Sequence, residues 1–435
     1  MSGSCSPKES FMTFEPVVAA RPRRTHRAWI VAAVAFLALL GAAGFRAAPS
    51  VLMVPITDEF GWSRSVLSAA VGINLLLFGL TAPFAAALMD RFGIRTVTSV
   101  ALTVVALGSA LSVFVTSPWQ ILLTWGLLIG LGTGSMALVF AAMVTDRWFT
   151  RRRGLVSGIL TAGSATGQLI FLPVVAVLAE NSGWRTASLV VAAGALVVVP
   201  FVLLFLRDSP AEVGELPYGA TEAPTPVVVT GNPAVRALKA LRDASSVRTF
   251  WALMVGFAIC GATTNGLVGV HFIPSAHDHG MPQTTAAGLL AVVGIFDIVG
   301  TIGSGWLTDR VDPRVLLGAY YAFRGVALLF LPALLSDALH PSIVVFIVIY
   351  GLDWVATVPP TIALCREVFG TQGPLVFGWV FASHQVGAGI ASVVAGMVRD
   401  ATGEYTAAWF GAAGLCVVAA VLSVGIARRS APVTG

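Results

Sequence analysis

The sequence predicts an all-α membrane protein with twelve transmembrane helices in two six-helix pseudo-repeats. Three observations support this: an apolar composition, long apolar runs along the whole chain, and a repeat between its two halves. Of 435 residues, 57% are hydrophobic and 11% are charged, and the mean hydropathy is +0.87. A soluble domain has about 25% charged residues, so most of this chain must face something other than water.

Twelve runs are long enough for helices that cross a bilayer of about 30 Å, which takes about 20 residues. They cover residues 28–50, 64–89, 95–116, 119–145, 154–179, 185–206, 249–273, 286–308, 314–336, 341–365, 374–398 and 404–427. The strands of a membrane barrel would alternate polar and apolar residues, and these runs do not. The first run is longer than the apolar core of a signal peptide, so we expect it to be retained.

A polar, proline-rich segment separates the first six runs from the last six, and it reads as a linker with a short amphipathic helix at 235–241. We therefore expect a tail at 1–27, a six-helix half at 28–206, the linker at 207–248, a second six-helix half at 249–427, and a tail at 428–435.

The basic residues predict the orientation. Of 26 Lys and Arg residues, 21 fall on the side that holds both termini and the linker. By the positive-inside rule, that side is cytoplasmic, and we expect a multi-pass protein of the cell membrane. The net charge of +5 is then a topology signal, and no nucleic-acid partner is expected. The four cysteines are scattered, so we expect neither a disulfide nor a metal site. Nothing in the sequence resembles a nucleotide-hydrolysis loop, so we expect no cofactor, and we also expect a monomer.

The two halves resemble each other at a fixed offset of 219 residues. This shift aligns VPITDEFG at 54–61 with IPSAHDHG at 273–280, and LMDRFGIR at 88–95 with LTDRVDPR at 307–314. One register across separate loops indicates two parallel repeats, whose substrate site lies between them near the middle of the membrane.

The second pair of loops holds the candidate gating residues. The offset superposes three pairs: Asp90 on Asp309, Arg91 on Arg310, and Arg95 on Arg314. Carboxylates can cap helix N-termini and pair with arginines across the two halves, which would favour an outward-facing state until the ions separate. The alternative is that these arginines serve topology alone.

These D-R-x-G-x-R and D-R-x-x-x-R loops resemble the motif of the major facilitator superfamily. Within it, WFTRRRGLVSGILTAGSATG at 148–167 resembles a signature of the monocarboxylate transporters, as do DEFGW at 58–62 and Asp297. The resemblance implies a secondary transporter, and not an enzyme, that moves a small monocarboxylate or other organic anion together with a proton by alternating access. An efflux pump for drugs or lipophilic metabolites has the same fold and stays open as an alternative.

Members of that family carry a lysine in the first span where this chain has Ser50. Arg46 lies one turn earlier on the same helical face, so the substrate-binding cation is expected there. A guanidinium can hold a carboxylate with two parallel hydrogen bonds. The alternative for Arg46 is that its side chain extends toward the membrane interface.

Asp297 lies near the middle of the eighth span and is the first candidate for proton coupling. A carboxyl group in a low-dielectric environment can load and release a proton, and buried acids in membranes are functional candidates by default. Arg324 in the ninth span lies at the same depth, about 16 Å from the cytoplasmic ends. We expect Arg324 to be the counter-ion of Asp297. The alternative is a static ion pair without a transport role.

The remaining candidates for the substrate site are polar residues at half depth in other spans. Tyr350, Asp353 and Trp354 share one face of the tenth span, and Pro359-Pro360 should kink that helix just beyond. Asn265 in the seventh span and His384 in the eleventh are expected to contact substrate, and His384 is a second proton carrier because imidazole titrates near pH 6.5. A lone polar residue in a bundle can also serve only to join helices.

Overall fold

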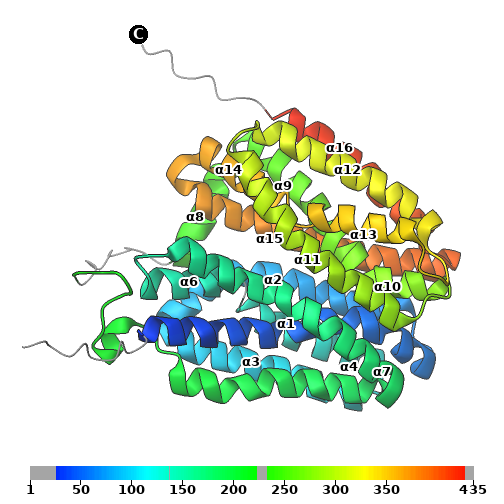
Figure 1. Ribbon diagram of the computed structural model, residues 1–435, viewed down its shortest axis with the longest axis horizontal. Helices are drawn as coiled ribbons and strands as arrows, with labels where there is room; N and C mark the ends of the chain where they lie inside the picture. The colour runs from blue at the N-terminus through cyan, green and yellow to red at the C-terminus, as the bar shows by residue number, and fades with distance from the viewer. Residues whose placement is uncertain (1–25, 137, 223–232, 427–435) are drawn as a thin grey trace, which may run out of the picture.

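The computed structural model describes residues 26–136, 138–222 and 233–426. Figure 1 shows two bundles of helices that lie side by side, with the blue-to-green helices in one and the green-to-red helices in the other. Among the described residues, β pairing is confined to one isolated bridge between Phe149 and Tyr218. The predicted tail at 428–435, and all but the last two residues of the tail at 1–27, lie outside the described residues.

The first bundle is built from the chain up to Phe205. Its helices are α1 (Arg27–Phe60), α2 (Arg64–Phe92), α3 (Ile94–Leu111), α4 (Pro118–Ile121), the π-helix η2 (Leu122–Ile129), α5 (Gly130–Gly134), α6 (Leu138–Trp148) and α7 (Arg153–Phe205). The Ser63 hydroxyl caps the start of α2 by accepting a bond from the Val66 amide. Gly93, at φ +85°, ends α2 because glycine enters this region of backbone space without strain.

Helix α7 is a helical hairpin. Gly183 has φ 82° and ψ 157°, which no helix continues, and the chain reverses there. A Cβ atom placed on Gly194 would lie 3.5 Å from the ring of Phe171, so residues at similar distances before and after Gly183 face each other. The runs predicted at 154–179 and 185–206 are the two arms of this hairpin.

The second bundle follows the linker. Its helices are α8 (Pro233–Ser245), α9 (Arg248–Gly261), the π-helix η4 (Ala262–Val268), α10 (Gly269–Asp278), α11 (Gln283–Thr308), α12 (Pro313–Leu334), α13 (Pro341–Asp353), α14 (Val358–Phe369), α15 (Gly373–Thr402) and α16 (Thr406–Val424). Short 3₁₀ turns lie at Ser112–Phe114, Pro210–Val213 and Gly370–Gln372.

The tenth predicted span is broken where the sequence predicts a kink. Helix α13 ends at Asp353 and α14 begins at Val358, so the break lies just before Pro359-Pro360. Each proline lacks an amide hydrogen, and its ring collides with the carbonyl group four residues earlier, so a straight helix cannot pass through residues 355 and 356.

Ten helical stretches within the described residues are long and apolar enough to cross a membrane. One of them, Ile170–Phe205, includes both sides of the turn at Gly183. The predicted run at 119–145 corresponds to the interrupted series from α4 to α6. The chain is therefore the helical membrane protein that its composition predicts.

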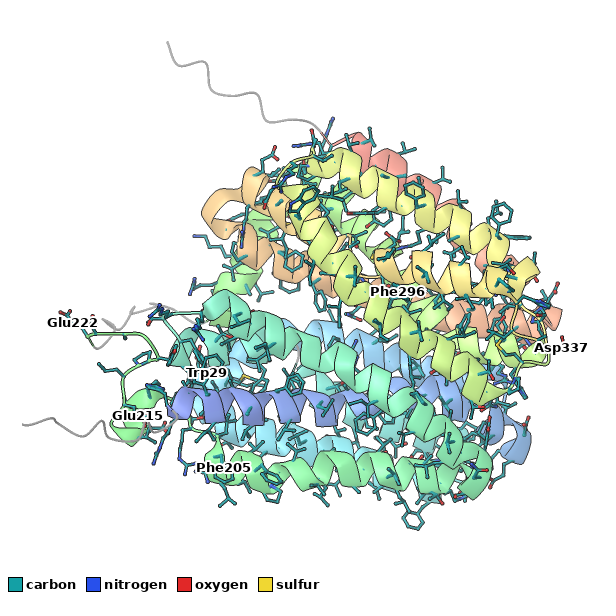
Figure 2. The ribbon with its side chains drawn as sticks, in the orientation of Figure 1. Trp29, Phe205, Glu215, Glu222, Phe296 and Asp337 are labelled. Carbon is teal, nitrogen blue, oxygen red and sulfur yellow. The ribbon has the colours of Figure 1, made fainter. Side chains whose placement is uncertain are left out.

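The two ends of the bundle pair differ. We call the end that holds the linker the linker end and the opposite one the far end. Figure 2 shows Glu215 and Glu222 of the linker at the first and Asp337 at the second. At the linker end, α8 packs against both α2 and α15, and the Trp379 indole donates a hydrogen bond to the Ala237 carbonyl oxygen at 2.8 Å. This helix includes the amphipathic helix predicted at 235–241.

Toward the far end, α2 and α15 bring the halves into backbone contact through glycines. A Cβ atom on Gly72 would lie 2.9 Å from the Gly389 carbonyl oxygen, and one on Gly396 would lie 2.6 Å from the Ser68 hydroxyl. At half depth, a Cβ atom on Gly79 would lie 2.5 Å from Cβ of Gln385. Small residues allow this approach between membrane helices. The halves therefore touch along the far half of α2 and α15.

Candidate functional site

Arg46 and His384 lie on opposite sides of the interface at half depth, separated by two aromatic rings. The Arg46 guanidinium lies over the Phe78 ring, 4.9 Å from its centre. The Phe78 ring meets Phe381 of the other half at 6.5 Å between centres, and Phe381 stacks on His384 at 5.9 Å. Arg46 of the first half and His384 of the second therefore lie on either side of the contact between Phe78 and Phe381.

His384 is held in place by close packing of α15 on α9. Its ring lies 5.0 Å from that of Phe257, and no side chain would fit at Gly261, which lies against the His384 backbone. The residue is 8% exposed, and its Nδ1 has no hydrogen-bond partner in the described part of the chain. An imidazole with one unused nitrogen can accept or donate a proton without first breaking a bond at that atom.

Asp297 is half-buried on α11 and faces the break between α13 and α14. Its Oδ1 accepts a hydrogen bond from the Thr301 hydroxyl and another from the Val355 amide, both at 3.1 Å. That amide is available because Val355 lies in the broken segment, outside any helix. Both donors are neutral groups. Among the described residues, neutral donors therefore hold the carboxyl group in place, and the helix break supplies one of them.

Arg324 pairs with Asp353, and this differs from the predicted pairing with Asp297. Its Nε lies 2.6 Å from Oδ2 of Asp353, and its Nη2 donates to the Asp353 carbonyl oxygen at 2.7 Å. The two side chains are 0% and 8% exposed, inside the second half. Equal depth along two helices does not fix which way their side chains point, and Arg324 points toward α13.

The other predicted substrate contacts are also distributed unevenly. Tyr350 is buried inside the second half, where its hydroxyl donates to the Thr263 carbonyl oxygen at 2.7 Å. Trp354 lies edge-on to the Tyr350 ring. Asn265 lies in the π-helix η4, partly exposed, and Ser50 is buried on α1 one turn from Arg46. Tyr350 and Asp353 therefore support the interior of one half, whereas Arg46 and His384 lie at the interface.

The loops predicted to gate form ion pairs within each half. Arg147 pairs with Asp90 at 2.6 Å in the first half, and Arg314 pairs with Glu367 at 2.6 Å in the second. The pairing predicted across the halves belongs to an outward-facing state, so these ion pairs within each half do not test it and it stays a prediction.

The other residues of these loops contact their own neighbours. The Arg95 amide donates to Asp208 at 2.8 Å, and the Arg91 side chain lies over Phe92. Asp309 directly follows the last residue of α11, and the next residue, Arg310, lies over the Trp306 ring, 4.1 Å from its centre.

The polar contacts that join the halves lie instead at the far end, and the sequence analysis missed them. Both carboxylate oxygens of Asp400, at the end of α15, accept backbone hydrogen bonds from α2, one from Arg64 and one from Ser65, each at 2.9 Å. Ser392 donates to the Ser68 carbonyl oxygen at 3.2 Å. On the other side, Glu180 of α7 accepts from the Thr284 amide of α11 at 3.0 Å. The far end is closed by these bonds.

One signal for this contact is present in the sequence. Gly72 and Gly79 are seven residues apart, and so are Gly389 and Gly396. A seven-residue spacing keeps small residues on one helical face, where they allow two membrane helices to approach closely. The partner of each face is still not specified by the spacing.

Comparison with known proteins identifies the family. The model of the Major Facilitator Superfamily matches residues 32–373. The chain is 31% identical over 348 residues to monocarboxylate transporter 13 of Bos taurus, which covers 78% of this chain and 75% of that protein. It is 26% identical over 395 residues to the uncharacterized MFS-type transporter YcxA of Bacillus subtilis, with 87% and 90% covered.

A solved structure shows the same fold. It is that of a bacterial homolog to the human lysosomal transporter Spinster, in an inward-facing and occupied conformation. The TM-score is 0.70 at 16% sequence identity, over 92% of this chain and 97% of that one. Together with the family match and the relatives, the two packed bundles lead to one conclusion: the chain belongs to the major facilitator superfamily of transporters and resembles the monocarboxylate transporters within it.

Proposed function

We propose that this protein moves a small monocarboxylate anion together with a proton across the cell membrane by alternating access. The observation that supports this most directly is the placement of Arg46 and His384 on either side of the contact between Phe78 and Phe381, at half depth. A site between two repeats near the middle of the membrane is reached from each side in turn as the halves rock.

Arg46 would bind the carboxylate of the substrate. A guanidinium offers two parallel N–H donors, which match the two oxygens of a carboxylate, and such bonds are stronger than those between neutral groups. Its position over the Phe78 ring fits a substrate with a short apolar body, which would lie among the aromatic rings of Phe78 and Phe381.

Asp297 would carry the proton, with His384 as a second carrier. Asp297 has neutral hydrogen-bond donors, so gaining a proton does not break an ion pair. Burial disfavours the charged carboxylate, and proton release restores the charge when water reaches it. Arg324 is then a structural cation, since its charge is already balanced by Asp353.

The linker end would face the cytoplasm, since most basic residues lie there. With the far end closed by Asp400 and Glu180, the state described here would be inward-facing. Opening to the outside would break the bonds from Asp400 to α2. It would form the predicted ion pairs between the two gating loops across the halves at the linker end.

Uptake into proteoliposomes tests the proposal. Labelled lactate and pyruvate are added outside vesicles that hold the purified protein, with and without an inward proton gradient. We expect accumulation only with the gradient, and its loss on adding a protonophore. Arg46→Ala should abolish uptake, and Arg46→Lys should retain part of it, since a lysine keeps the charge without the two parallel donors.

Two results would contradict the proposal. One is the absence of gradient-dependent uptake for every carboxylate in a panel of short monocarboxylates. The other is unchanged uptake in Arg46→Ala, which would favour the efflux of uncharged lipophilic compounds instead.

A further inference from the structure

A pocket lies inside the second half, away from the interface that holds Arg46. It has a volume of about 190 Å³ and lies between α12 and α13. Its walls include Phe323 and Ile349, which are 65% and 46% exposed on the outer surface of the bundle. In a membrane protein such a surface faces lipid, so the pocket opens toward the bilayer.

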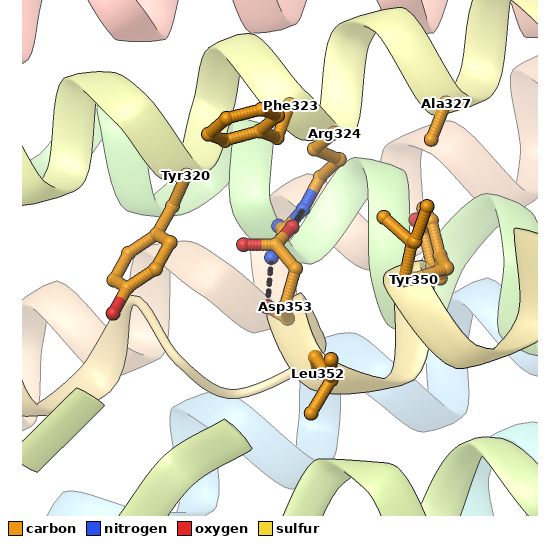
Figure 3. A pocket seen from close by; sticks show the side chains of 8 residues that line it. Tyr320, Phe323, Arg324, Ala327, Tyr350, Leu352 and Asp353 are labelled. Carbon is orange, nitrogen blue, oxygen red and sulfur yellow. Dashed lines mark hydrogen bonds and ion pairs between the residues drawn. The ribbon is translucent and has the colours of Figure 1, made fainter. Parts of the chain in front are cut away.

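The floor of this pocket is the ion pair of Arg324 and Asp353, seen in Figure 3. Oδ2 of Asp353 accepts from Arg324, but Oδ1 has no hydrogen-bond partner among the described residues, although the residue is only 6% exposed. Figure 3 shows one carboxylate oxygen turned away from Arg324 toward the side of Tyr320, whose own hydroxyl points elsewhere.

Arg324 cannot supply the missing donor. Its Nε bonds to Oδ2 of Asp353, and its Nη2 bonds to the carbonyl oxygens of Asp353 and Trp354. Its Nη1 faces the Cys260 sulfur and the Thr263 hydroxyl. All five N–H groups are therefore directed to other acceptors. A buried acceptor without a donor is unfavourable, so the pocket favours a ligand that brings one.

The surroundings restrict the chemistry of that ligand. An anion would be repelled by the free carboxylate oxygen, and the single positive charge of Arg324 is already balanced by Asp353. Lipid acyl chains at this depth carry no donor. A neutral hydroxyl on an apolar body meets both requirements. An engineered apolar cavity of about 150 Å³ binds benzene, so a pocket of 190 Å³ can hold one aromatic ring.

We propose that this pocket binds a neutral lipophilic phenol that enters from the bilayer. The hydroxyl donates to Oδ1 of Asp353, the ring lies between Tyr350 and Ala327, and an alkyl tail leaves past Phe323 into lipid. This site is separate from the transport site and does not depend on the substrate proposed above.

Binding of 4-hexylphenol to the full chain in lipid nanodiscs tests this site. The comparison ligand is 4-hexylanisole, whose ring and tail are the same but whose methyl ether cannot donate a hydrogen bond. We expect one saturable site for labelled 4-hexylphenol, and at least tenfold weaker competition by 4-hexylanisole. Equal competition by both ligands, or no saturable binding, would overturn the proposal.

Two variants locate the site. Ala327→Phe fills the pocket and should abolish saturable binding, whereas Val326→Phe adds the same ring one residue away on the exposed surface and should leave it unchanged. If Ala327→Phe unfolds, Ile349→Trp fills the pocket from the opposite wall and should likewise abolish saturable binding. Binding that survives a folded, pocket-filling variant would place the phenol elsewhere and overturn the proposal.

Discussion

Asp297 and Asp353 both lie at half depth in the second half of the chain, but their surroundings differ. Asp353 is bound to Arg324 at 2.6 Å in the interior of one half. Asp297 is half-buried, faces a broken helix and, in the described part of the chain, accepts hydrogen bonds from the neutral groups of Thr301 and Val355. The two residues are therefore both aspartates at the same depth, but one has a charged partner and the other has neutral partners.

We propose that this difference separates a structural carboxylate, Asp353, from a proton-carrying one, Asp297. Asp353 must stay charged, because losing its charge leaves Arg324 buried without compensation, which is strongly unfavourable. Among the described residues, neutralising Asp297 would leave no arginine bonded to it without a counter-charge, so Asp297 can change protonation during a transport cycle. Depth alone, which is all that a span position gives, does not distinguish these two roles.

The largest expected effect comes from breaking the buried pair. Arg324→Met leaves Asp353 uncompensated and should lower the free energy of unfolding by about 3–5 kcal/mol. Replacing both partners, with Arg324→Met and Asp353→Leu, should recover most of that loss because no buried charge remains. Denaturant unfolding of the purified variants measures both. A double variant no more stable than the single one would contradict the assignment of Asp353 as a structural partner.

A loss of function without a loss of stability is expected at the other carboxylate. Asp297→Asn keeps the size of the side chain, and its free energy of unfolding should change by no more than about 1.5 kcal/mol, the value of an ordinary hydrogen bond. Accumulation driven by a proton gradient should disappear, while exchange of substrate between the two sides persists. Thr308→Ala is the matched control on the same helix and should keep coupling, because its hydroxyl bonds to the Ser304 carbonyl oxygen of α11 itself.

The same variant gives the sign of the pH dependence. If the protonated carboxyl is the form that carries the proton inward, uptake by the original protein falls as external pH is raised, because fewer molecules load a proton. Uptake by Asp297→Asn should not vary with pH in this way. A pH profile that is the same in both proteins would remove Asp297 from the coupling step.

A third carboxylate sharpens the comparison, because Asp400 bonds across the halves. Asp400→Asn removes one charged acceptor from the first amides of α2, which costs about 1.4 kcal/mol and shifts the closed far end tenfold toward open. Labelling of Ser68→Cys by an impermeant maleimide added at the far side should rise about tenfold. Unchanged labelling would show that other contacts keep this end closed.

The smallest change in the free energy of unfolding is expected for an ion pair of the same length that lies at the surface. Arg185 and Glu59 also lie 2.6 Å apart, but their side chains are 44% and 39% exposed. Such exposed pairs contribute about 0–1 kcal/mol. Glu59→Gln should therefore change the unfolding free energy by less than about 1 kcal/mol in the assay used for Arg324→Met. A loss as large as that of the buried pair would show that burial is not the deciding factor.

Much of the fold could be predicted from the sequence because it follows from local properties. Run length and composition locate helices, and the proline pair locates the break before Val358. Glycine at 183 allows the reversal in α7. None of these requires knowledge of what each helix packs against.

The site could be predicted only in part because side-chain direction depends on packing. Counting residues along the helix gave Arg324 its depth, but its partner is set by the contact of α12 with α13. The bonds from Asp400 join residues 336 and 335 positions apart, so no local pattern specifies them. Arg46 and His384, which lie at the interface, are singled out by the sequence because ionisable side chains are rare in apolar runs, and their role in transport stays a prediction.

The facing glycines of α2 and α15 have one more consequence. Gly72 lies against the Gly389 carbonyl oxygen, and Gly396 lies against the Ser68 side chain and the Arg64 carbonyl oxygen, so at both places the two helices are too close for an added Cβ atom. When the far end is closed, the distance between α2 and α15 is therefore well defined. A methyl group added at either glycine pushes the two helices apart. It therefore favours the state in which the far end is open, whichever substrate is transported.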